Sequence, residues 1–358
     1  MPYKEQLLKC KTIPSLNGWR AFAVMIVILG HLKSTLQPQS TFYSLLDNLV
    51  FPEFGVRIFF VLSGFLITTL LVKEKEKQGK INIKNFFIRR FLRIVPVLWL
   101  YLLVVAGLNH LFRFDLSLSH FLGPFFYLNN FNFFPGVWLL GHTWSLAVEE
   151  QFYLIWPFLF RLSRNITQVA IFFISVTPFI ILITYFKPHL ANLLLEPFLR
   201  PAVAIFTGAL LSMAWIKNFY NFKIERFLTL GAFFTIMALS LAIYILRDRG
   251  IFGIILYPAG DTLLNFSIAY LIVFSILKKE SLIFDILNNS IVIKIGTLSY
   301  SIYLWQQLFI IPKDSYVGWS SYLTFPINLL AIAAVAWLSY HYFEEPFLKL
   351  KNKFSLIN

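Results

Sequence analysis

The stretch SLNGWRAFAVMIVILGHLK, residues 15–33, decides the fold class because it places two ionisable side chains around an apolar run. Every residue from Ala21 to Leu29 is apolar, with Arg20 before this run and His31 after it. On an α-helix, the separation of eleven residues turns the side chain of His31 to within about 20° of the direction of Arg20. Both side chains therefore lie on one face, roughly 16 Å apart along the helix axis. An Arg in a membrane helix usually faces a bundle interior or a wet cavity. The stretch predicts a membrane helix with a functional face; the alternative is a snorkelling Arg and an interfacial His.

The composition indicates a polytopic membrane protein. Of 358 residues, 58% are hydrophobic and only 13% are charged, and the mean hydropathy is +0.71. In soluble domains the charged share approaches a quarter. The net charge of +14 comes from Lys and Arg residues that lie between apolar runs, which is typical of orientation in a bilayer and predicts no nucleic-acid partner. The single cysteine, Cys10, excludes an intrachain disulfide and a cysteine-based metal site, and we predict no metal.

Apolar runs long enough to cross about 30 Å of hydrocarbon recur about ten times. We therefore predict an all-α chain with about ten transmembrane helices in a single domain, residues 1–358. The predicted spans are 14–33, 52–72, 91–112, 143–162, 167–186, 198–216, 227–246, 262–277, 291–311 and 322–343. They form a membrane core of 14–343, followed by a short cytoplasmic tail of 344–358.

The distribution of basic residues predicts the topology. Eight Lys and Arg residues lie between Lys73 and Arg93, whereas the alternate loops hold few. This asymmetry predicts that both termini are cytoplasmic. The segment 115–141 is aromatic and contains Pro124 and Pro135, so we expect a surface or re-entrant segment over the outer mouth. The first apolar run has no small-residue cleavage site after it and is expected to remain as the first span.

A second informative stretch is GHTWSLAVEEQFYLIWPF, residues 141–158, in which two adjacent glutamates enter a predicted membrane helix. His142 lies two turns before Glu149 on the same face, and Glu150 points about 100° away. A buried carboxylate must be protonated, paired with Arg or His, or beside water. Glu149 is therefore a candidate to orient an imidazole. The alternative is a helix that starts at the interface, where its glutamates complement the helix dipole.

A third stretch, NIKNFFIRRFLRIVP at residues 82–96, places Arg89, Arg90 and Arg93 on the cytoplasmic side. The spacings of three and four residues allow one cationic patch. Guanidinium groups bind phosphate bidentately, so the patch suits a phosphate-bearing donor such as coenzyme A. The alternative is a role in topology and in binding anionic lipid headgroups.

Two further stretches favour packing over chemistry. In GVRIFFVLSGFLITTLL, residues 55–71, Arg57 and the Ser63–Gly64 pair lie inside the second span, and a small pair of this kind usually packs helices together. No G-x-S-x-G elbow surrounds Ser63, so it is not expected to be a nucleophile. The stretches LSYSIYLWQQLF at 298–309 and SYHYFEEPF at 339–347 combine polar residues with aromatics that are typical of span ends.

Taken together, these stretches resemble the acyltransferase 3 family of integral membrane acyltransferases, which includes bacterial O-acetyltransferases of surface polysaccharides. The match runs in order across nearly the whole chain, and the string WSLAVEEQFY is highly specific. The resemblance implies a ten-helix core, a cytoplasmic acyl-CoA donor and an acceptor hydroxyl at the membrane or beyond it. It also implies an essential Arg20–His31 pair, an acidic pair at Glu149 and Glu150, and a basic motif at Arg89, Arg90 and Arg93.

The chain departs from this family at two points. The family often has His after YLW, where this sequence has Gln306, so a proton-transfer role at that position cannot be carried over. Many relatives add an extracytoplasmic SGNH-hydrolase-like domain, and we expect none here.

We predict an O-acyltransferase of the bacterial cytoplasmic membrane that transfers an acyl group, expected to be acetyl, to a surface glycan, glycolipid or other hydroxyl acceptor. His31 is the predicted general base, since an imidazole titrates near pH 7, and an acyl-His31 intermediate is the less favoured variant. Glu149 would orient the imidazole, and Arg20 would hold the donor or stabilise oxyanion charge. His142 and Glu150 complete the candidate site. Acetyl-CoA enters as a substrate, with no permanently bound cofactor, and membrane lipids are the other partners. The alternative is a transporter or flippase, and an Arg-lined anion channel is a weaker one.

Overall fold

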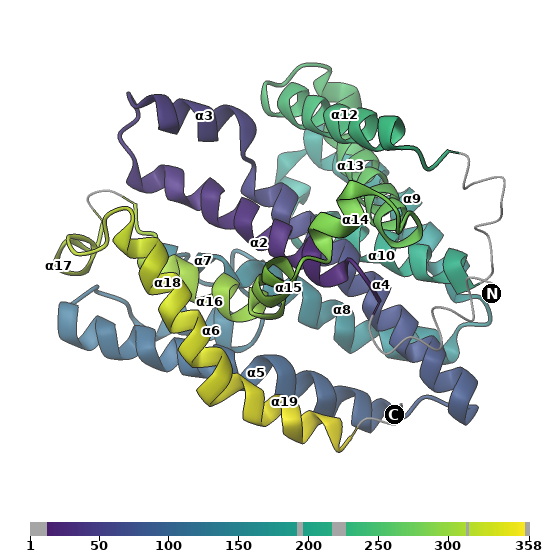
Figure 1. Cartoon of the computed structure of the whole chain (residues 1–358), viewed down its shortest axis with the longest axis horizontal. Helices are drawn as coiled ribbons and strands as arrows, with labels where there is room; N and C mark the ends of the chain where they lie inside the picture. Colours follow the sequence, from purple (N-terminus) through teal and green to yellow (C-terminus); the bar gives the residue numbers. More distant parts are fainter. Residues whose placement is uncertain (1–12, 192–195, 217–226, 313–314, 355–358) are drawn as a thin grey trace. The chain divides into compact units, whose positions relative to one another are not determined.

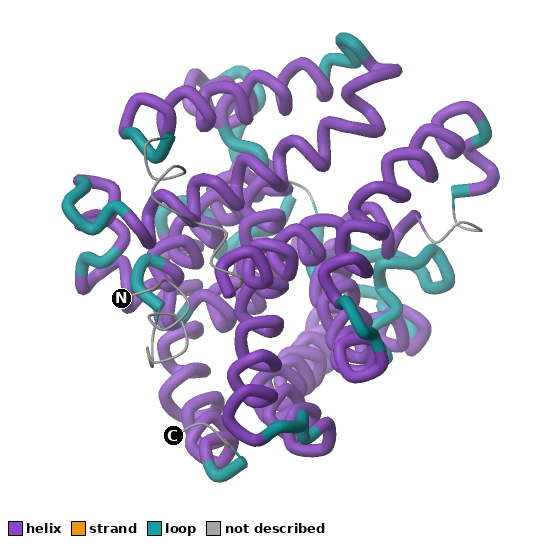
Figure 2. The backbone as a smooth tube through the Cα atoms, turned by 90° about the vertical axis from the view of Figure 1, so that its right-hand side faces the viewer, coloured by secondary structure: helices purple, strands orange, loops and turns teal. Residues whose placement is uncertain are grey.

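The computed structural model describes residues 13–191, 196–216, 227–312 and 315–354. Within these ranges the chain consists of helices and loops without a strand (Figures 1 and 2), which confirms the predicted all-α class. The predictions about Cys10 lie outside the described residues. The chain divides into two compact units: unit 1 is Met1–Ala21, Arg57–Gly79 and Gln151–Gly296, and unit 2 is Phe22–Val56, Lys80–Glu150 and Thr297–Asn358.

Six helical segments in the described part of the chain are long and apolar enough to cross a membrane. They are Thr41–Gln78, Ile83–Phe112, Ile166–Phe186, Glu196–Ile216, Leu230–Arg247 and Gly253–Leu277. Helices α2 (Leu16–Leu32) and α8 (Thr143–Leu162) follow the predicted spans at 14–33 and 143–162 closely, but are not among the six. Helix α2 has 17 residues, fewer than the roughly 20 that a span requires, and α8 carries two glutamates. Ten spans and cytoplasmic termini therefore stay predictions.

Five predicted spans differ clearly from the structure. The helix of the 52–72 run continues to Gln78, and the helix of the 91–112 run begins at Ile83. The run 291–311 is divided into α15 (Ser290–Thr297) and α16 (Ser299–Phe309), with the break beside residues of low helix propensity. The run 322–343 begins only after Pro326, as α18 (Ile327–Leu338), and continues as the π-helical turn η3 (Ser339–Glu344). The run 262–277 was predicted too short, because α13 (Gly253–Leu277) starts nine residues earlier and includes the charged Asp261.

Unit 1 is built around α13, which packs against α9 (Ile166–Phe186), α10 (Glu196–Ile216) and α12 (Leu230–Asp248). Figure 1 shows α12 running beside α13. The helices are apolar and supply a core of Leu, Ile, Val and Phe side chains. Short helices complete the unit: η2 (Pro188–Leu190) and α14 (Leu282–Leu287).

Within unit 1, α4 (Pro52–Gln78) and α10 approach each other at backbone distance. A Cβ atom at Gly64 would collide with the carbonyl oxygen of Ile205, and one at Gly208 would collide with the carbonyl oxygen of Val61. Only glycine permits such an approach. The packing role predicted for Gly64 is therefore confirmed.

Unit 2 contains α5 (Ile83–Phe112), α16, α18 and α19 (Glu345–Asn352). Helix α19 lies along α5, and α16 packs against α18 (Figure 1). The segment 115–141 contains only α6 (Leu118–Phe125) and α7 (Trp138–Gly141), in agreement with the prediction that no helix crosses the membrane there. The other short helices are η1 (Lys33–Thr35), α3 (Thr41–Leu49) and α17 (Val317–Ser320).

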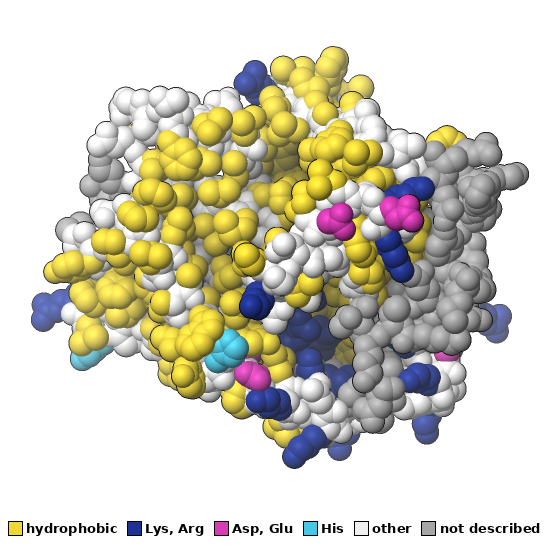
Figure 3. All heavy atoms as spheres, viewed as in Figure 1, with side chains coloured by type: hydrophobic (Ala, Val, Ile, Leu, Met, Phe, Trp, Pro, Cys, Tyr) yellow, Lys and Arg dark blue, Asp and Glu magenta, His cyan; other side chains and the backbone are white. Residues whose placement is uncertain are grey.

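Large apolar side chains remain exposed on the long helices of both units. Leu103 on α5, Phe179 on α9 and Leu330 on α18 each keep about two thirds of their surface or more. Hydrophobic side chains cover much of the face that Figure 3 presents. Soluble monomers rarely expose contiguous apolar surface on this scale, whereas a lipid environment requires it. The chain is therefore an integral membrane protein.

Candidate active site

His31 lies near the end of α2 and is held in unit 2 by two side chains. Its Nδ1 atom is 3.0 Å from Oε1 of Gln306 on α16, and its ring meets the edge of Trp138 with the ring centroids 5.6 Å apart. The indole of Trp138 in turn donates to the carbonyl of Ile310 at 2.8 Å. His31 is therefore fixed in orientation by an amide and an aromatic ring.

The contact with Gln306 determines the tautomer of His31. An amide oxygen only accepts hydrogen bonds, so Nδ1 carries the hydrogen. In the neutral ring this leaves the lone pair on Nε2, which is the form that a general base requires. The structure thus gives the Nδ1 contact to Gln306, whereas the sequence assigned the orienting role to Glu149.

Helix α16 buries two adjacent amides beside this imidazole. Gln306 is fully buried and Gln307 is 4% exposed. Among the described residues, neither Nε2 of Gln306 nor Oε1 of Gln307 has a hydrogen-bond partner. Most buried polar atoms in proteins are paired, so such unpaired atoms mark places where a ligand or water can bind.

His142, directly after α7, occupies a buried aromatic pocket in the same unit. Its ring lies edge-on to Tyr101 and Tyr303, with centroid distances of 5.3 and 5.7 Å, and it interacts electrostatically with His31. The structure therefore brings His31 and His142 together, as two imidazoles in one polar but largely buried region.

A hydroxyl network anchors the start of α8 beside His142. The hydroxyls of Tyr303 and Ser145 are 2.7 Å apart, and each donates to the carbonyl of His142 at 3.1 Å. Tyr303 also interacts electrostatically with Glu149. The amide of Asn129 donates to Thr143 at 2.9 Å. Glu149 thus acts electrostatically on a residue of the His142 pocket, and its orientation toward His142 stays a prediction from helical spacing.

Glu150 has different surroundings. Its Oε1 atom is buried without a hydrogen-bond partner among the described residues, and its carboxylate interacts electrostatically with Arg90 and Glu149. The two glutamates are therefore not equivalent.

The predicted basic patch lies on the first turns of α5. Arg89 donates to the carbonyl of Phe354 at 2.9 Å, and Arg90 lies over the ring of Phe86 at 5.9 Å. Arg93 interacts electrostatically with Glu344 and Tyr300. All three side chains are half-buried in unit 2. Their cationic groups are thus on one helix end, within the unit that holds His31.

Arg20 is assigned to unit 1, although α2 continues through both residues of the predicted pair. Its guanidinium donates to Oδ1 of Asn17 at 3.2 Å. Nearby, the indole of Trp19 donates to Ser275 at 2.9 Å, which fixes this end of the helix. The shared role of Arg20 and His31 stays a prediction from helical spacing.

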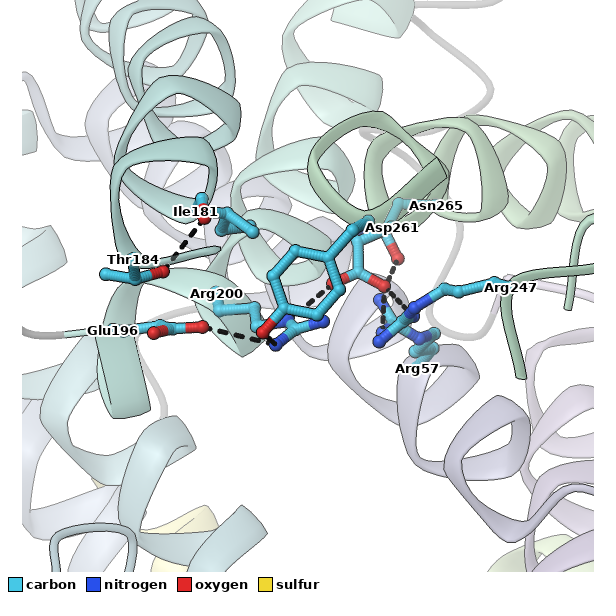
Figure 4. Close-up of polar contacts among 9 residues, drawn as sticks. Arg57, Ile181, Thr184, Glu196, Arg200, Arg247, Asp261 and Asn265 are labelled. Carbon is cyan, nitrogen blue, oxygen red and sulfur yellow. Dashed lines mark hydrogen bonds and ion pairs between the residues drawn. The ribbon is translucent and has the colours of Figure 1, made fainter. Parts of the chain in front are cut away.

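Sequence reasoning did not find two features of the structure. It noted Gln306 only as a departure, whereas the structure makes it the partner of His31. It also named no partner for Arg57, whereas Arg57, Arg200 and Arg247 all pair with Asp261 in unit 1 (Figure 4). The available signal was a charged residue near the end of each apolar segment, the same rule that selected Arg20.

The helices and this site define a class, namely integral membrane proteins with imidazole, carboxylate and guanidinium groups buried in a helical core. The acyltransferase domain of the acyltransferase 3 family matches residues 13–347, and the chain belongs to that family.

Two similar proteins are the O-acetyltransferases OatA of Staphylococcus aureus strains NCTC 8325 / PS 47 and COL, each 28% identical to the chain over 372 residues. The alignments cover 96% of the chain and 58% of each relative. The chain therefore spans little more than half the length of these relatives. No solved structure matches it.

Proposed function

We propose that the chain is a membrane-embedded O-acyltransferase that moves an acyl group, with acetyl as the expected case, from cytoplasmic acyl-CoA to a hydroxyl of a surface glycan or glycolipid. The observation that carries the proposal is the His31–Gln306 contact of 3.0 Å, since it presents Nε2 of the imidazole as a base. Membership of the acyltransferase 3 family and the similarity to O-acetyltransferases support the reaction class.

The chemistry follows from the proton balance. Nε2 of His31 takes the proton of the acceptor hydroxyl as its oxygen attacks the thioester carbonyl. The C–S bond then breaks, and the coenzyme A sulfur leaves with the proton that the imidazolium returns. The hydrogen bond from Nδ1 to Gln306 holds the ring in position during both transfers. His31 acts as a base when the hydroxyl attacks and as an acid when the coenzyme A sulfur leaves.

The other candidate residues have supporting roles in this proposal. Arg89, Arg90 and Arg93 bind the phosphates of the donor, since guanidinium groups match phosphate oxygens in charge and geometry. Glu149, beside Tyr303, tunes the His142 pocket electrostatically. Arg20 keeps the role that the sequence predicts, which is to hold the donor or to stabilise oxyanion charge.

The test uses purified full-length chain in nanodiscs with radiolabelled acetyl-CoA and cell-envelope extract as the acceptor source. Release of coenzyme A together with label in the extract supports the proposal, and His31→Ala should remove both signals. Substrate movement across the bilayer without coenzyme A release would instead favour the transporter alternative. Mass spectrometry of surface glycans and lipids from deletion and complemented strains then identifies the acceptor.

A further inference from the structure

The described part of unit 1 contains a buried carboxylate that three guanidinium groups share. Asp261 on α13 is 1% exposed. Its Oδ1 atom is 2.5 Å from Nη2 of Arg57 and also pairs with Nη1 of Arg247, and its Oδ2 atom is 2.9 Å from Nε of Arg200 (Figure 4). One carboxylate carries a single negative charge. The three cations therefore compete for it.

Arg200 has a second anionic partner in this cluster. Nη1 of Arg200 donates to Glu196 and to the hydroxyl of Tyr257, each at 3.2 Å, and its guanidinium lies 4.6 Å from the Tyr257 ring centroid. Arg57 has no second carboxylate within the ranges that the structure describes. The charge of Arg57 is balanced only by Asp261, which Arg200 and Arg247 also contact. A buried charge without full compensation is costly.

Two hydrogen-bond donors in this cluster lack an acceptor. Arg57 is 9% exposed and Asn265 is fully buried, and they contact each other because Nη1 of Arg57 lies 3.4 Å from Oδ1 of Asn265. Neither Nε of Arg57 nor Nδ2 of Asn265 is paired within the described residues. Both groups are N–H donors, so only an acceptor atom would satisfy them.

The cluster lies where several helices of unit 1 end. Arg57 and Arg200 occupy the first two turns of α4 and α10, and Arg247 lies in the last turn of α12. Arg200 and Arg247 keep 21% and 18% of their side-chain surface, so the cluster is not sealed within the unit. The predicted topology assigns the starts of α4 and α10 to the extracytoplasmic side.

We propose that Arg57 and Asn265 form a binding site for an oxyanion, a phosphate or a carboxylate, which Arg200 and Arg247 favour through their charge. The oxyanion would accept from Nε of Arg57 and Nδ2 of Asn265 and supply the negative charge that Asp261 cannot. On the extracytoplasmic side, this group would be part of the acceptor, and that assignment rests on the proposed acyltransferase function. A lipid headgroup phosphate offers the same chemistry.

Binding is tested on the full chain in maltoside micelles, which contain no phosphate, by thermal unfolding, with inorganic phosphate or acetate against sodium chloride of equal ionic strength. We expect one of these oxyanions, at ten or more times its dissociation constant, to raise the unfolding temperature by roughly 2–4 °C above chloride. Asn265→Asp removes one donor and supplies an internal negative charge. It should keep or raise the basal unfolding temperature and abolish the oxyanion effect.

Two variants separate binding from stability. Arg57→Lys keeps the charge but removes the Nε donor, so most of the oxyanion effect should be lost. The matched control is Thr69→Val, which breaks the buried contact of 2.9 Å between Thr69 and Ser212 in the same unit. Thr69→Val should lower the basal unfolding temperature and leave the oxyanion effect intact.

The outcomes decide both the site and the source of its ligand. No effect of phosphate or acetate beyond chloride overturns the site, as does an effect that Asn265→Asp and Arg57→Lys both retain. Phosphatidylglycerol nanodiscs test for a lipid ligand. If they raise the unfolding temperature and added phosphate then has no further effect, the ligand is a lipid headgroup and the acceptor assignment is overturned. The unfolding measurement does not require acyl transfer. A negative result therefore rejects the oxyanion site without rejecting the acyltransferase function, and a failed acyl-transfer assay does not reject the site.

Discussion

The His31 region of unit 2 and the Asp261 region of unit 1 differ in how their buried polar groups are paired. Around His31, the contacts are to neutral amides, hydroxyls and rings, and several polar atoms have no hydrogen bond among the described residues. Around Asp261, the groups are fully charged and joined by three ion pairs. Neutral surroundings leave an imidazole free to exchange a proton, whereas a dense ion-pair network fixes its members. The first region suits chemistry and the second suits binding.

The strongest test of this comparison is His31→Ala. Loss of a general base should lower acyl transfer by about 10³-fold, within the usual range for such groups. The measurement is coenzyme A release per folded protein in nanodiscs. Lys33→Ala is the matched control, because it removes an exposed ion pair with Asp47 at the same end of the helix. Wild-type turnover by His31→Ala at equal expression would remove His31 from the chemistry.

The two glutamates sharpen the comparison within unit 2. Glu149→Gln should lower turnover by about 10²-fold with little loss of stability, because the amide keeps the shape but not the charge beside Tyr303. Glu150→Gln should act mainly on stability, since it replaces a buried carboxyl group that interacts electrostatically with Arg90. Turnover normalised to folded protein separates these effects. If Glu150→Gln is inactive and Glu149→Gln has near-normal turnover, the proposed catalytic role belongs to Glu150 and not to Glu149.

The basic patch provides a further test. Replacing Arg89, Arg90 and Arg93 singly with Gln should weaken acetyl-CoA binding by roughly tenfold and flatten its salt dependence, because charge-assisted hydrogen bonds are lost. Isothermal calorimetry with a non-hydrolysable acetyl-CoA analogue measures this directly. Unchanged affinity together with altered lipid dependence assigns the patch to headgroups instead.

Substitution of Gln306 should have a smaller effect on turnover, because Gln306 orients the His31 ring and takes no part in proton transfer. Gln306→Leu removes the acceptor for Nδ1–H of His31, and we expect turnover to fall about tenfold with little change in KM. Gln306→Glu retains an acceptor oxygen and should recover much of this loss. Equal activity of the Leu and Glu variants would show that the contact does not orient the ring.

The smallest effect is expected at the exposed start of α19. Lys349 and His341 donate hydrogen bonds to Glu345 and lower the pKa of that carboxyl. A lowered pKa contributes stability above the unfolded-state value that is lost as the pH falls through the folded-state value. Because the Lys349 and His341 pairs of Glu345 lie at the surface, where ion pairs contribute little, Glu345→Gln should leave the unfolding temperature unchanged between pH 3 and pH 7. A measurable shift would show that this surface is covered.

The fold followed the sequence where an apolar segment had the length of one span. The spans predicted at 143–162 and 167–186 match α8 and α9 to within a residue, because their hydrophobic length determines the helix. The start of α13 was placed too late because Asp261 looks like the end of an apolar run. Three arginines from other helices neutralise it, and no local pattern reveals such long-range pairing.

The candidate site shows the same division. Helical spacing predicts that His142 and Glu149 share a face, but His142 precedes α8 in the structure, so the shared face stays a prediction. The partner of His31 could not be predicted, because Gln306 follows it by 275 positions in the chain and joins it only through folding. Sequence proposed the reactive groups, and the tertiary structure supplied their partners.

The contact between α4 and α10 has a practical consequence. At Gly64 and Gly208 no side chain stands between the two backbones, so a detergent tail has no room to enter either. Detergents dissolve membrane proteins by replacing lipid at accessible surfaces, and this seam offers none. We expect α4 and α10 to remain paired through extraction and purification, so a spectroscopic label pair across the seam would give a fixed reference for following the rest of unit 1 in micelles.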